Sequence, residues 1–264
     1  MDLKHKGKTA LVNGSTAGIG FGIAHRLLQE GASVIINGRT EARINSALDQ
    51  LPQDIPDCIV QGCDADFADA AAVQRLLGTY DTVDILINNV GIFEPKPFTE
   101  ITDEEWLHFF EVNVLSGVRL SRHYLPQMLE QNWGRIIFIS SESGVQIPAE
   151  MVHYDTTKTA QLGVSRGLAQ QTAGTNVTVN TVIPGSTRSE GSEKFISGLA
   201  QERGLSKEDV EREFFEKIRP TSLLERFATI DEVATFVTYL ASPLAAANNG
   251  AALRVDGGTV STIL

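Results

Sequence analysis

Asn13-Gly14-Ser15-Thr16-Ala17-Gly18-Ile19-Gly20 is the stretch that decides the fold. The apolar residues 8–13 predict a short buried strand, and the residues after the stretch predict a helix to about residue 30, ended by Gly31. Glycines let the backbone approach a pyrophosphate, and a helix amino end offers it free N–H groups and a positive dipole. The glycine spacing differs from the usual dinucleotide pattern, so the strand–turn–helix context carries most of the argument for a phosphate site.

The rest of the chain alternates predicted strands and helices. Apolar runs predict strands at residues 32–37, 58–63, 84–88, 134–140, 176–183 and 252–255. Periodic stretches predict helices at residues 41–51, 68–77, 102–131, 150–173 and 231–241. Strands separated by such helices pair in parallel and carry helices on both faces of the sheet. We expect an α/β fold with a doubly wound, Rossmann-like parallel sheet in three layers, as a single domain over residues 1–264.

Residues 186–225 interrupt this alternation. Residues 186–205 are rich in Ser, Gly and charged side chains, and residues 208–217 predict a charged amphipathic helix. The segment leaves the sheet at a carboxyl edge, where ligands bind in open α/β folds. Long loops in compact domains are usually functional or disordered. We interpret the segment as a substrate lid; the alternative is a solvated insertion.

Composition narrows the classes of function. The chain carries 33 acidic and 22 basic residues, a net charge of −11, which disfavours nucleic acid and anionic membranes as partners. Cys58 and Cys63 are too few for a disulfide framework and lack the spacing of a zinc site, so we expect no metal. No run of apolar residues is long enough to span a membrane, and the first residues do not resemble a secretory signal. We expect a cytoplasmic protein that acts on small molecules.

Tyr154 and Lys158 form a second informative pattern, with Ser141 thirteen positions before Tyr154. On a helix, a spacing of four places the phenol and the ammonium on one face, one turn apart. A nearby ammonium favours the phenolate, so we expect it to lower a tyrosine pKa that starts at about 10. Tyr154 could then exchange a proton with a carbonyl oxygen that Ser141 holds. The alternative is a surface tyrosine, a solvated lysine and a strand-end hydroxyl.

Together these motifs resemble the short-chain dehydrogenase/reductase family, in its single-domain branch, nearly from end to end. The matching positions, in chain order, are the glycine turn at residues 14–20, Asp64, Asn88-Asn89-Val90-Gly91, Asn113, Ser141, Tyr154, Lys158 and Pro184-Gly185. Two positions depart from the family pattern: Asn13 replaces the usual Thr, and Val90 replaces the usual Ala. We expect both to be tolerated.

The resemblance implies an oxidoreductase that transfers a hydride between a nicotinamide cofactor and a carbonyl or alcohol. It implies catalytic roles for Asn113, Ser141, Tyr154 and Lys158. Tyr154 would exchange the proton, while Ser141 places and polarises the carbonyl. Lys158 would hold the nicotinamide ribose and bias Tyr154 toward its ionised form. Asn113 would hold a water that links Lys158 to solvent, although by sequence alone it could simply be a polar residue that bonds the backbone.

The resemblance also implies a cofactor-binding set: Gly14, Ser15, Thr16, Gly18, Ile19, Gly20, Arg39, Asp64, Asn89, Gly91, Tyr154, Lys158, Pro184, Gly185, Thr187 and Ser189. In this set Asp64 would face the adenine. Thr187 and Ser189 would bind the nicotinamide carboxamide, or else be ordinary turn hydroxyls.

Cofactor preference depends on the end of the second strand. NAD-using members of the family carry an acidic residue there that accepts from the ribose hydroxyls. Here the run is Asn37-Gly38-Arg39-Thr40, which has no carboxylate. Arg39 can pair with a 2′-phosphate, or it could be a solvent-facing turn residue that stacks on adenine. We therefore predict NADP(H), with NAD(H) possible.

Substrate contacts are expected from Phe93, Ser143, Gln146 and His153, which flank the motif residues. His153 could instead be a polar residue at a helix start. Related family members include 3-oxoacyl-thioester reductases, steroid and tropinone-type reductases, and sugar or polyol dehydrogenases. Residues 186–202 contain no basic cluster that would dock an acidic carrier protein, so we favour a free small carbonyl compound over a 3-oxoacyl thioester.

Two other classes of function use the same scaffold. A nucleotide-sensing protein would need the glycine turn but not the proton-transfer residues, all of which this chain has. A lyase or dehalogenase would have exchanged the glycine turn for an anion pocket, which Gly14, Gly18 and Gly20 argue against. Small and apolar residues in the helices at 102–131 and 150–173 predict a homo-oligomer, either a tetramer or a dimer.

Overall fold

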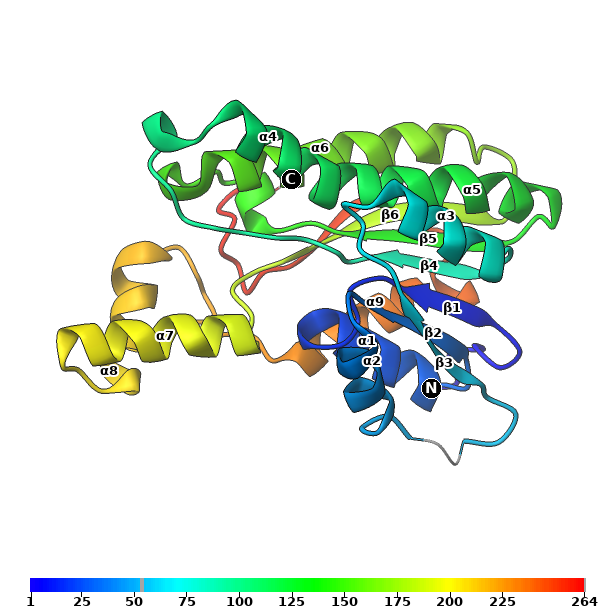
Figure 1. Cartoon of the computed structure of the whole chain (residues 1–264), viewed down its shortest axis with the longest axis horizontal. Helices are drawn as coiled ribbons and strands as arrows, with labels where there is room; N and C mark the ends of the chain where they lie inside the picture. Colours follow the sequence, from blue (N-terminus) through cyan, green and yellow to red (C-terminus); the bar gives the residue numbers. More distant parts are fainter. Residues whose placement is uncertain (53–54, 264) are drawn as a thin grey trace.

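Seven parallel strands form one sheet within residues 1–52 and 55–263, which the computed structural model describes (Figure 1). The strands are β1 (Thr9–Val12), β2 (Ser33–Gly38), β3 (Val60–Asp64), β4 (Ile85–Asn88), β5 (Gly134–Ile139), β6 (Val177–Pro184) and β7 (Ala252–Val255). Their order across the sheet is β3-β2-β1-β4-β5-β6-β7, and every neighbouring pair is parallel. The predicted doubly wound parallel sheet is confirmed.

The order reverses between β1 and β4, which lie side by side at the centre of the sheet. In open α/β sheets, the crevice outside the carboxyl ends of the strands at such a reversal is where ligands bind. The glycine turn follows β1, and Asn89 and Gly91 follow β4. The topology therefore brings two of the sequence motifs together at one edge of the sheet.

Helices cover both faces of the sheet and complete three layers (Figure 1). One face carries α1 (Gly18–Gln29), α2 (Glu41–Leu48) and α9 (Ile230–Leu240). The other carries α3 (Ala70–Thr79), α5 (Ser116–Glu130) and α6 (Val152–Gln170), with α4 (Asp103–Phe110) leading into α5. Short 3-10 turns lie at Phe98–Glu100, Glu142–Gly144, Ala149–Met151 and Pro243–Ala245.

The predicted helix at residues 102–131 contains an irregularity that the sequence pattern did not predict. Thr102 and Glu105 form the expected capping box, but a π-turn at Glu111–Leu115 separates α4 from α5. Such turns insert one residue into the helical ladder and occur often at functional sites. Here the π-turn holds Asn113, one of the predicted catalytic residues.

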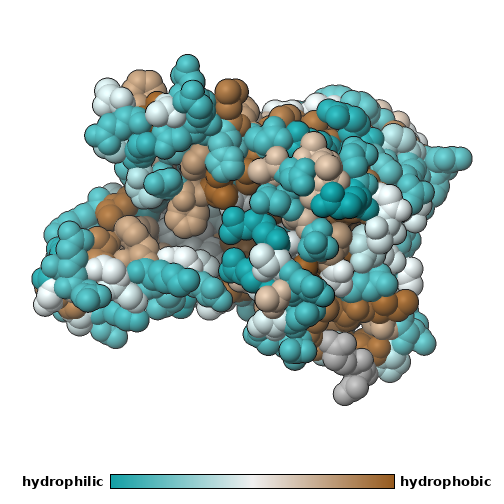
Figure 2. Space-filling model, viewed as in Figure 1, coloured by the Kyte–Doolittle hydropathy of each residue, from teal (hydrophilic) through white to brown (hydrophobic). Residues whose placement is uncertain are grey.

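The segment predicted as a lid forms a lobe of its own, built from α7 (Glu190–Arg203), α8 (Lys207–Glu213) and a π-turn at Phe214–Ile218. We call residues 190–218 the α7–α8 lobe. Its α7 was not predicted, because Ser and Gly are frequent there; Ser189 caps it and the left-handed Gly204 ends it. Figure 2 shows the molecule hollowed between this lobe and the part that contains α4 and α6.

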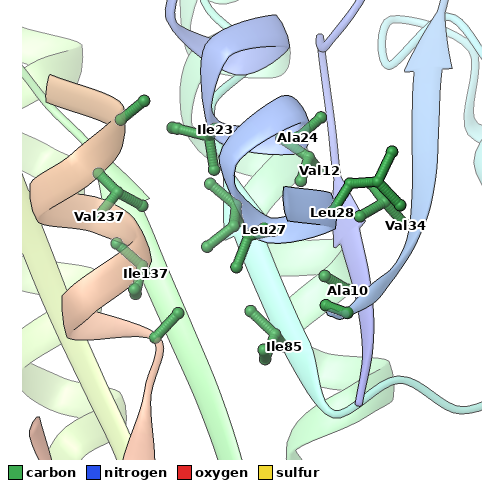
Figure 3. Close-up of a cluster of buried hydrophobic side chains, with 14 of the residues drawn as sticks. Ala10, Val12, Ile23, Ala24, Leu27, Leu28, Val34, Ile85, Ile137 and Val237 are labelled. Atoms are coloured by element: carbon green, nitrogen blue, oxygen red, sulfur yellow. The ribbon is translucent and has the colours of Figure 1, made fainter. Parts of the chain in front are cut away.

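Burial of apolar side chains explains why the lobe is a distinct unit. The main cores lie between the sheet and its helices; Figure 3 shows one of them, where Ile23 and Leu27 of α1 meet Val237 of α9 over the sheet. A separate cluster joins Ile196, Ala200, Val210 and Phe215 of the lobe to Phe227, which lies beyond it in the chain. The lobe joins the sheet through a narrow neck, where Thr187 pairs with Ala228. Its apolar side chains thus pack apart from the two main cores.

Candidate active site

The glycine turn between β1 and α1 adopts a backbone that requires glycine. Gly14 and Gly18 have φ values of +60° and +59°, in the left-handed region that other residues rarely adopt. At Gly20, an added Cβ would lie 2.5 Å from both Asn89 Nδ2 and the Gly14 carbonyl oxygen. The turn therefore packs directly against the loop after β4 and leaves no room for a larger residue.

The amino end of α1 is open to an anion. Its N-cap residue, Ala17, supplies no side-chain cap, and its first turn has no acidic residue, whereas Thr40, Asp69 and Thr102 cap α2, α3 and α4. The first N–H groups of a helix lack intrahelical partners and lie at its positive end. Because Gly18 and Ile19 line a cavity, this end of α1 fits a pyrophosphate.

Three asparagines hold the turn in place. Asn13 Oδ1 accepts hydrogen bonds from the backbone N–H groups of Asn89 and Val90, both at 2.6 Å. Asn89 Nδ2 donates to the Gly14 carbonyl at 2.9 Å, and the Gly14 N–H donates to Asn37 Oδ1 at 3.0 Å. Asn13, which replaces the threonine expected at its position, thus ties the end of β1 to the loop after β4.

A cavity of about 660 Å³ lies over this turn and is the candidate cofactor cavity. The predicted cofactor residues that line it are Gly14, Thr16, Gly18, Ile19, Arg39, Asn89, Gly91 and Ser189. Arg43, four residues after Arg39 on α2, also lines it and was missed by the sequence analysis. Its place in the first turn of α2, directly after the turn that carries Arg39, was the signal that could have identified it.

Several predicted cofactor residues do not line this cavity, among them Ser15, Gly20, Asp64 and Lys158. Ser15 is fully buried beneath the turn, where its Oγ donates to the Val12 carbonyl at 2.6 Å and accepts from the Asn37 N–H at 2.9 Å. Asp64 ends β3 with an exposed side chain, and Asp66 lines the cavity instead. In this structure Ser15 supports the turn from below, while Asp66 offers a carboxylate to the candidate cofactor cavity.

A second cavity, also of about 660 Å³, is the candidate substrate cavity. Ser141, Tyr154, Pro184, Gly185, Thr187 and Ser189 line it, as do the predicted substrate residues Phe93 and Ser143. Ile19, Phe93, Ser189 and Gly191 line both cavities. The two cavities are therefore parts of one cleft at the carboxyl edge of the sheet.

Lys158 and Tyr154 lie one turn apart on α6, as the sequence predicted. Lys158 is buried, its Nζ donates to the Ile139 carbonyl at 2.9 Å, and it lies 5.7 Å from the centre of the Tyr154 ring. A Cβ added at Gly91 would be 3.2 Å from this Nζ. Gly91 thus keeps the space beside the ammonium open toward the candidate cofactor cavity.

The protonation of this pair differs from the sequence-based expectation. Burial, reinforced by the nearby Glu142 carboxylate, raises the pKa of Tyr154 above its ordinary value, and Ser141 only partly opposes this. Burial also lowers the pKa of Lys158 from 10.5 to about 8. The predicted lowering of the Tyr154 pKa by Lys158 is wrong for this structure, because the cost of burying a phenolate outweighs the hydrogen bond with Ser141 and the charge of Arg219, which lower that pKa.

Asn113 is held on every side in the π-turn. Its Oδ1 accepts from the Ile92 N–H at 2.8 Å, and its Nδ2 donates to the Ile92 carbonyl at 3.0 Å and to Thr157 Oγ1 at 2.9 Å. Its own carbonyl accepts from Gln161 Nε2 at 2.6 Å. Asn113 therefore ties the loop after β4 to α6, the helix that carries Tyr154 and Lys158.

Two predicted substrate residues do not reach the candidate substrate cavity. Gln146 Nε2 donates to Thr221 Oγ1 at 3.2 Å on the exposed surface. His153 is buried against Phe109, with ring centres 4.1 Å apart. Residues that sequence reasoning missed do line the cavity, notably Glu142, Lys217 and Arg219. Lys217 lies at the end of the lobe and Arg219 directly follows it, and no local motif places either residue beside Ser141.

Comparison with known proteins agrees with this geometry. The family model described as short chain dehydrogenase matches residues 8–199. The chain belongs to the short-chain dehydrogenase family. It is 49% identical over 263 residues to the oxidoreductase YvaG of Bacillus subtilis (strain 168), covering 100% of both chains. It is 33% identical to the D-beta-hydroxybutyrate dehydrogenase of Cupriavidus necator, covering 97% of this chain and 98% of that protein.

The L-sorbose reductase of Gluconobacter frateurii, solved in complex with NADPH and L-sorbose, superposes with a TM-score of 0.92. It is 30% identical in sequence, and the match covers 100% of both chains. Membership of the short-chain dehydrogenase family makes the protein an oxidoreductase that uses a nicotinamide cofactor. The open helix end, the glycine turn and the adjoining cavity of this structure fit such a group.

No helix within residues 1–52 and 55–263 is both long and apolar enough to cross a bilayer. Across the same described ranges, no three or more His, Cys, Asp or Glu side chains gather as they would around a metal ion.

Gly20→Ala should weaken cofactor binding about tenfold or more, because the added methyl group displaces Asn89 and the glycine turn. Titration with NADPH, followed by the change in its fluorescence, measures this. Gly78→Ala is the matched control, since nothing lies within 4 Å of an added Cβ on that exposed glycine of α3. Equal affinity in both variants would show that the turn tolerates a side chain.

Asp155 makes the stability of the protein depend on pH. It is fully buried, and burial, with Glu150 adding, raises its pKa from 3.8 to about 7. The folded state keeps the proton up to about pH 7 while the unfolded chain loses it above about pH 4, so the free energy of unfolding falls between these values, by up to ~4 kcal/mol. Asp155→Asn should remove much of this decrease. Urea denaturation of the wild-type protein and the variant at about pH 5 and pH 8 measures this. An equal loss of stability between the two pH values in both proteins would contradict the assignment.

Proposed function

We propose that this short-chain dehydrogenase transfers a hydride between NADP(H) and a small carbonyl or alcohol, with Tyr154 as the acid/base. The observation that carries the proposal is the position of Ser141 and Tyr154 on one wall of a cleft that continues into the cavity over the glycine turn. Lys158 lies on the same helix, one turn from Tyr154. A carbonyl in the candidate substrate cavity would meet a hydroxyl pair next to the cofactor.

The residues divide the work as follows. The bound nicotinamide supplies or accepts the hydride. Tyr154 donates its phenolic proton to the carbonyl oxygen during reduction and takes a proton from the alcohol during oxidation. Ser141 positions that oxygen by a hydrogen bond, and Lys158 contributes positive charge and a donor to the cofactor ribose. Asn113 holds the loop after β4 against α6, which keeps the cofactor side and the proton-transfer side in register.

The pKa shifts favour reduction near neutral pH. With its pKa raised by burial, Tyr154 holds its proton at pH 7, which is the form that can donate to a carbonyl. Oxidation of an alcohol needs the phenolate, so its rate should rise with pH. Lys158, whose pKa is lowered to about 8, is still mostly charged at pH 7.

Preference for NADP(H) is supported by the arginines at the adenosine end of the candidate cofactor cavity. Arg39 and Arg43 both line it, and β2 ends in Asn37 and Gly38, without a carboxylate that would repel a 2′-phosphate. The structural relative L-sorbose reductase was solved with NADPH, which agrees with this choice.

A free small substrate is supported by the charges of the lobe, which we propose is a substrate lid. Lys217 and Arg219 line the candidate substrate cavity together with Glu142 and Glu150, so the wall carries both signs of charge. Arg188, in the neck, is already paired with Glu193 and Glu211. An acidic carrier protein would find no unpaired basic cluster among these residues.

Association into a homo-oligomer, as a tetramer or a dimer, also remains a proposal. It is supported by Gly163 and Gly167 on α6, where nothing lies within 4 Å of an added Cβ. A helix face with such small residues allows another helix to pack closely.

Tyr154→Phe should abolish carbonyl reduction, by about a thousandfold or more, because the ring keeps its shape but loses the only proton that the mechanism uses. NADPH affinity should stay within about twofold, since the phenol contributes little to binding. The measurement is NADPH oxidation with a panel of small ketones, aldehydes, ketoses and 3-oxo acids. Turnover retained by the variant would refute the role of Tyr154.

Arg39→Ala and Arg43→Ala should each raise the KM for NADPH about tenfold and leave that for NADH within about twofold, because only NADPH carries the 2′-phosphate. Arg75→Ala, an exposed arginine on α3, serves as the control and should change neither. The NADP(H) assignment fails if the wild-type protein has the higher kcat/KM with NADH.

A further inference from the structure

A buried ion pair joins the end of the α7–α8 lobe to the wall beside Ser141. Arg219 directly follows the π-turn that ends the lobe, and its Nε donates to Glu142 Oε1 at 3.2 Å. The Arg219 and Glu142 side chains are only 11% and 7% exposed, and both line the candidate substrate cavity. A pair this far from water loses its solvation, so either charge left alone is costly.

The other oxygen of Glu142 is engaged by Ser141. Ser141 Oγ donates to Glu142 Oε2 at 2.9 Å and accepts from the Ser143 N–H at 3.2 Å. A serine hydroxyl has one proton to donate. In this arrangement that proton points to the carboxylate, so the hydrogen bond to Glu142 must break before the Ser141 hydroxyl can donate to a substrate carbonyl.

Arg219 acts on the same carboxylate from its far side. Its positive charge withdraws electron density from Glu142 and makes the carboxylate a weaker acceptor for the Ser141 proton. Arg219 is also within 3.6 Å of Glu150 Oε1, so it is the cation between two acidic side chains. Displacing the lobe would remove this cation and leave Glu142 free to hold the hydroxyl.

We propose that Glu142 and Arg219 are positioning residues through which the α7–α8 lobe controls the Ser141 hydroxyl. With the lobe in place, Arg219 pairs with Glu142 and the Ser141 proton can turn to the substrate oxygen. With the lobe displaced, the unpaired carboxylate retains that proton. The inference deepens, and rests on, the proposed function of the cleft.

The two residues also act on Tyr154 in opposite directions. Glu142 raises the pKa of Tyr154, and Arg219 lowers it. Other charged or titratable groups near the pair and Tyr154 are Glu150 before α6, Asp155 and Lys158 on α6, and Lys217 of the lobe. These four remain unchanged in the variants below, so a shift in the pH profile reports the altered pair.

The experiment compares Arg219→Met, Glu142→Gln and the double variant with the wild-type protein. Arg203→Met is the matched control, because Arg203 pairs with Glu213 inside the lobe and away from the cleft. Hydrogen–deuterium exchange of residues 190–218 measures docking of the lobe without any turnover. The pH profile of alcohol oxidation measures the effect on Tyr154 and uses NADP+ with the alcohol that corresponds to the carbonyl found in the panel. NADPH titration verifies that each variant is folded.

We expect Arg219→Met to speed exchange of the lobe several-fold, to lower kcat at least tenfold and to move the oxidation profile to higher pH by about half a unit or more. Glu142→Gln should move the profile to lower pH. In the double variant, hydrogen exchange of the lobe should increase by less than the sum of the increases in the two single variants, because neither charge of the pair is left without its partner. Arg203→Met should shift no profile.

If the pair had only a structural role, the pH profiles of the two single variants would coincide, and that result overturns the proposal. Unchanged lobe exchange in Arg219→Met overturns it as well, with or without turnover. If the wild-type protein oxidised NADPH with no carbonyl of the panel, the proposed function would fail on its own, and lobe exchange would still decide whether the pair docks the lobe.

Discussion

The hydrogen bonds that fasten the glycine turn to the loop after β4 are the interaction on which the site depends. Asn13 accepts hydrogen bonds from two successive N–H groups of that loop, and the Asn89 side chain donates one to the carbonyl of Gly14. These bonds replace sheet pairing at the point where β1 and β4 end and the chain must turn away. Because Asn13 is fully buried, leaving its amide oxygen unpaired would be costly. The cofactor side of the cleft is thereby held before any ligand arrives.

The opposite side of the cleft is built on α6 and depends on the same loop. Asn113 leaves the regular helical ladder in a π-turn, and its side chain bonds both the loop at Ile92 and Thr157 of α6. One amide thus fixes the distance between the glycine turn and the helix that carries Tyr154 and Lys158. Burial then shifts the pKa values of both groups toward their neutral forms. Hydrogen bonds tie the elements around the proton donor together, whereas the end of the lobe meets that wall through the ion pairs of Arg219 with Glu142 and Glu150.

Much of the fold could be predicted from local pattern. Strand positions, the parallel sheet and the helices on both faces follow from short apolar runs separated by amphipathic stretches, and Thr102 with Glu105 marks a helix start directly. Where local pattern and tertiary contact disagree, the prediction fails. Helix α7 was missed because its Ser and Gly residues are poor helix formers, while burial of Ile196 and Ala200 against Phe215 and Phe227 stabilises it.

The sequence was enough to predict the alternating architecture, the glycine turn and the spacing of Ser141, Tyr154 and Lys158, because these depend on periodicity and on residues close together in the chain. Packing between distant elements determines which other side chains meet them. Glu142 and Arg219 are 77 positions apart, and Gln146 and His153 turn away from the cavity that their neighbours line. Contacts of that kind, and the pKa shifts that burial causes, arise from packing between elements, which no local pattern records.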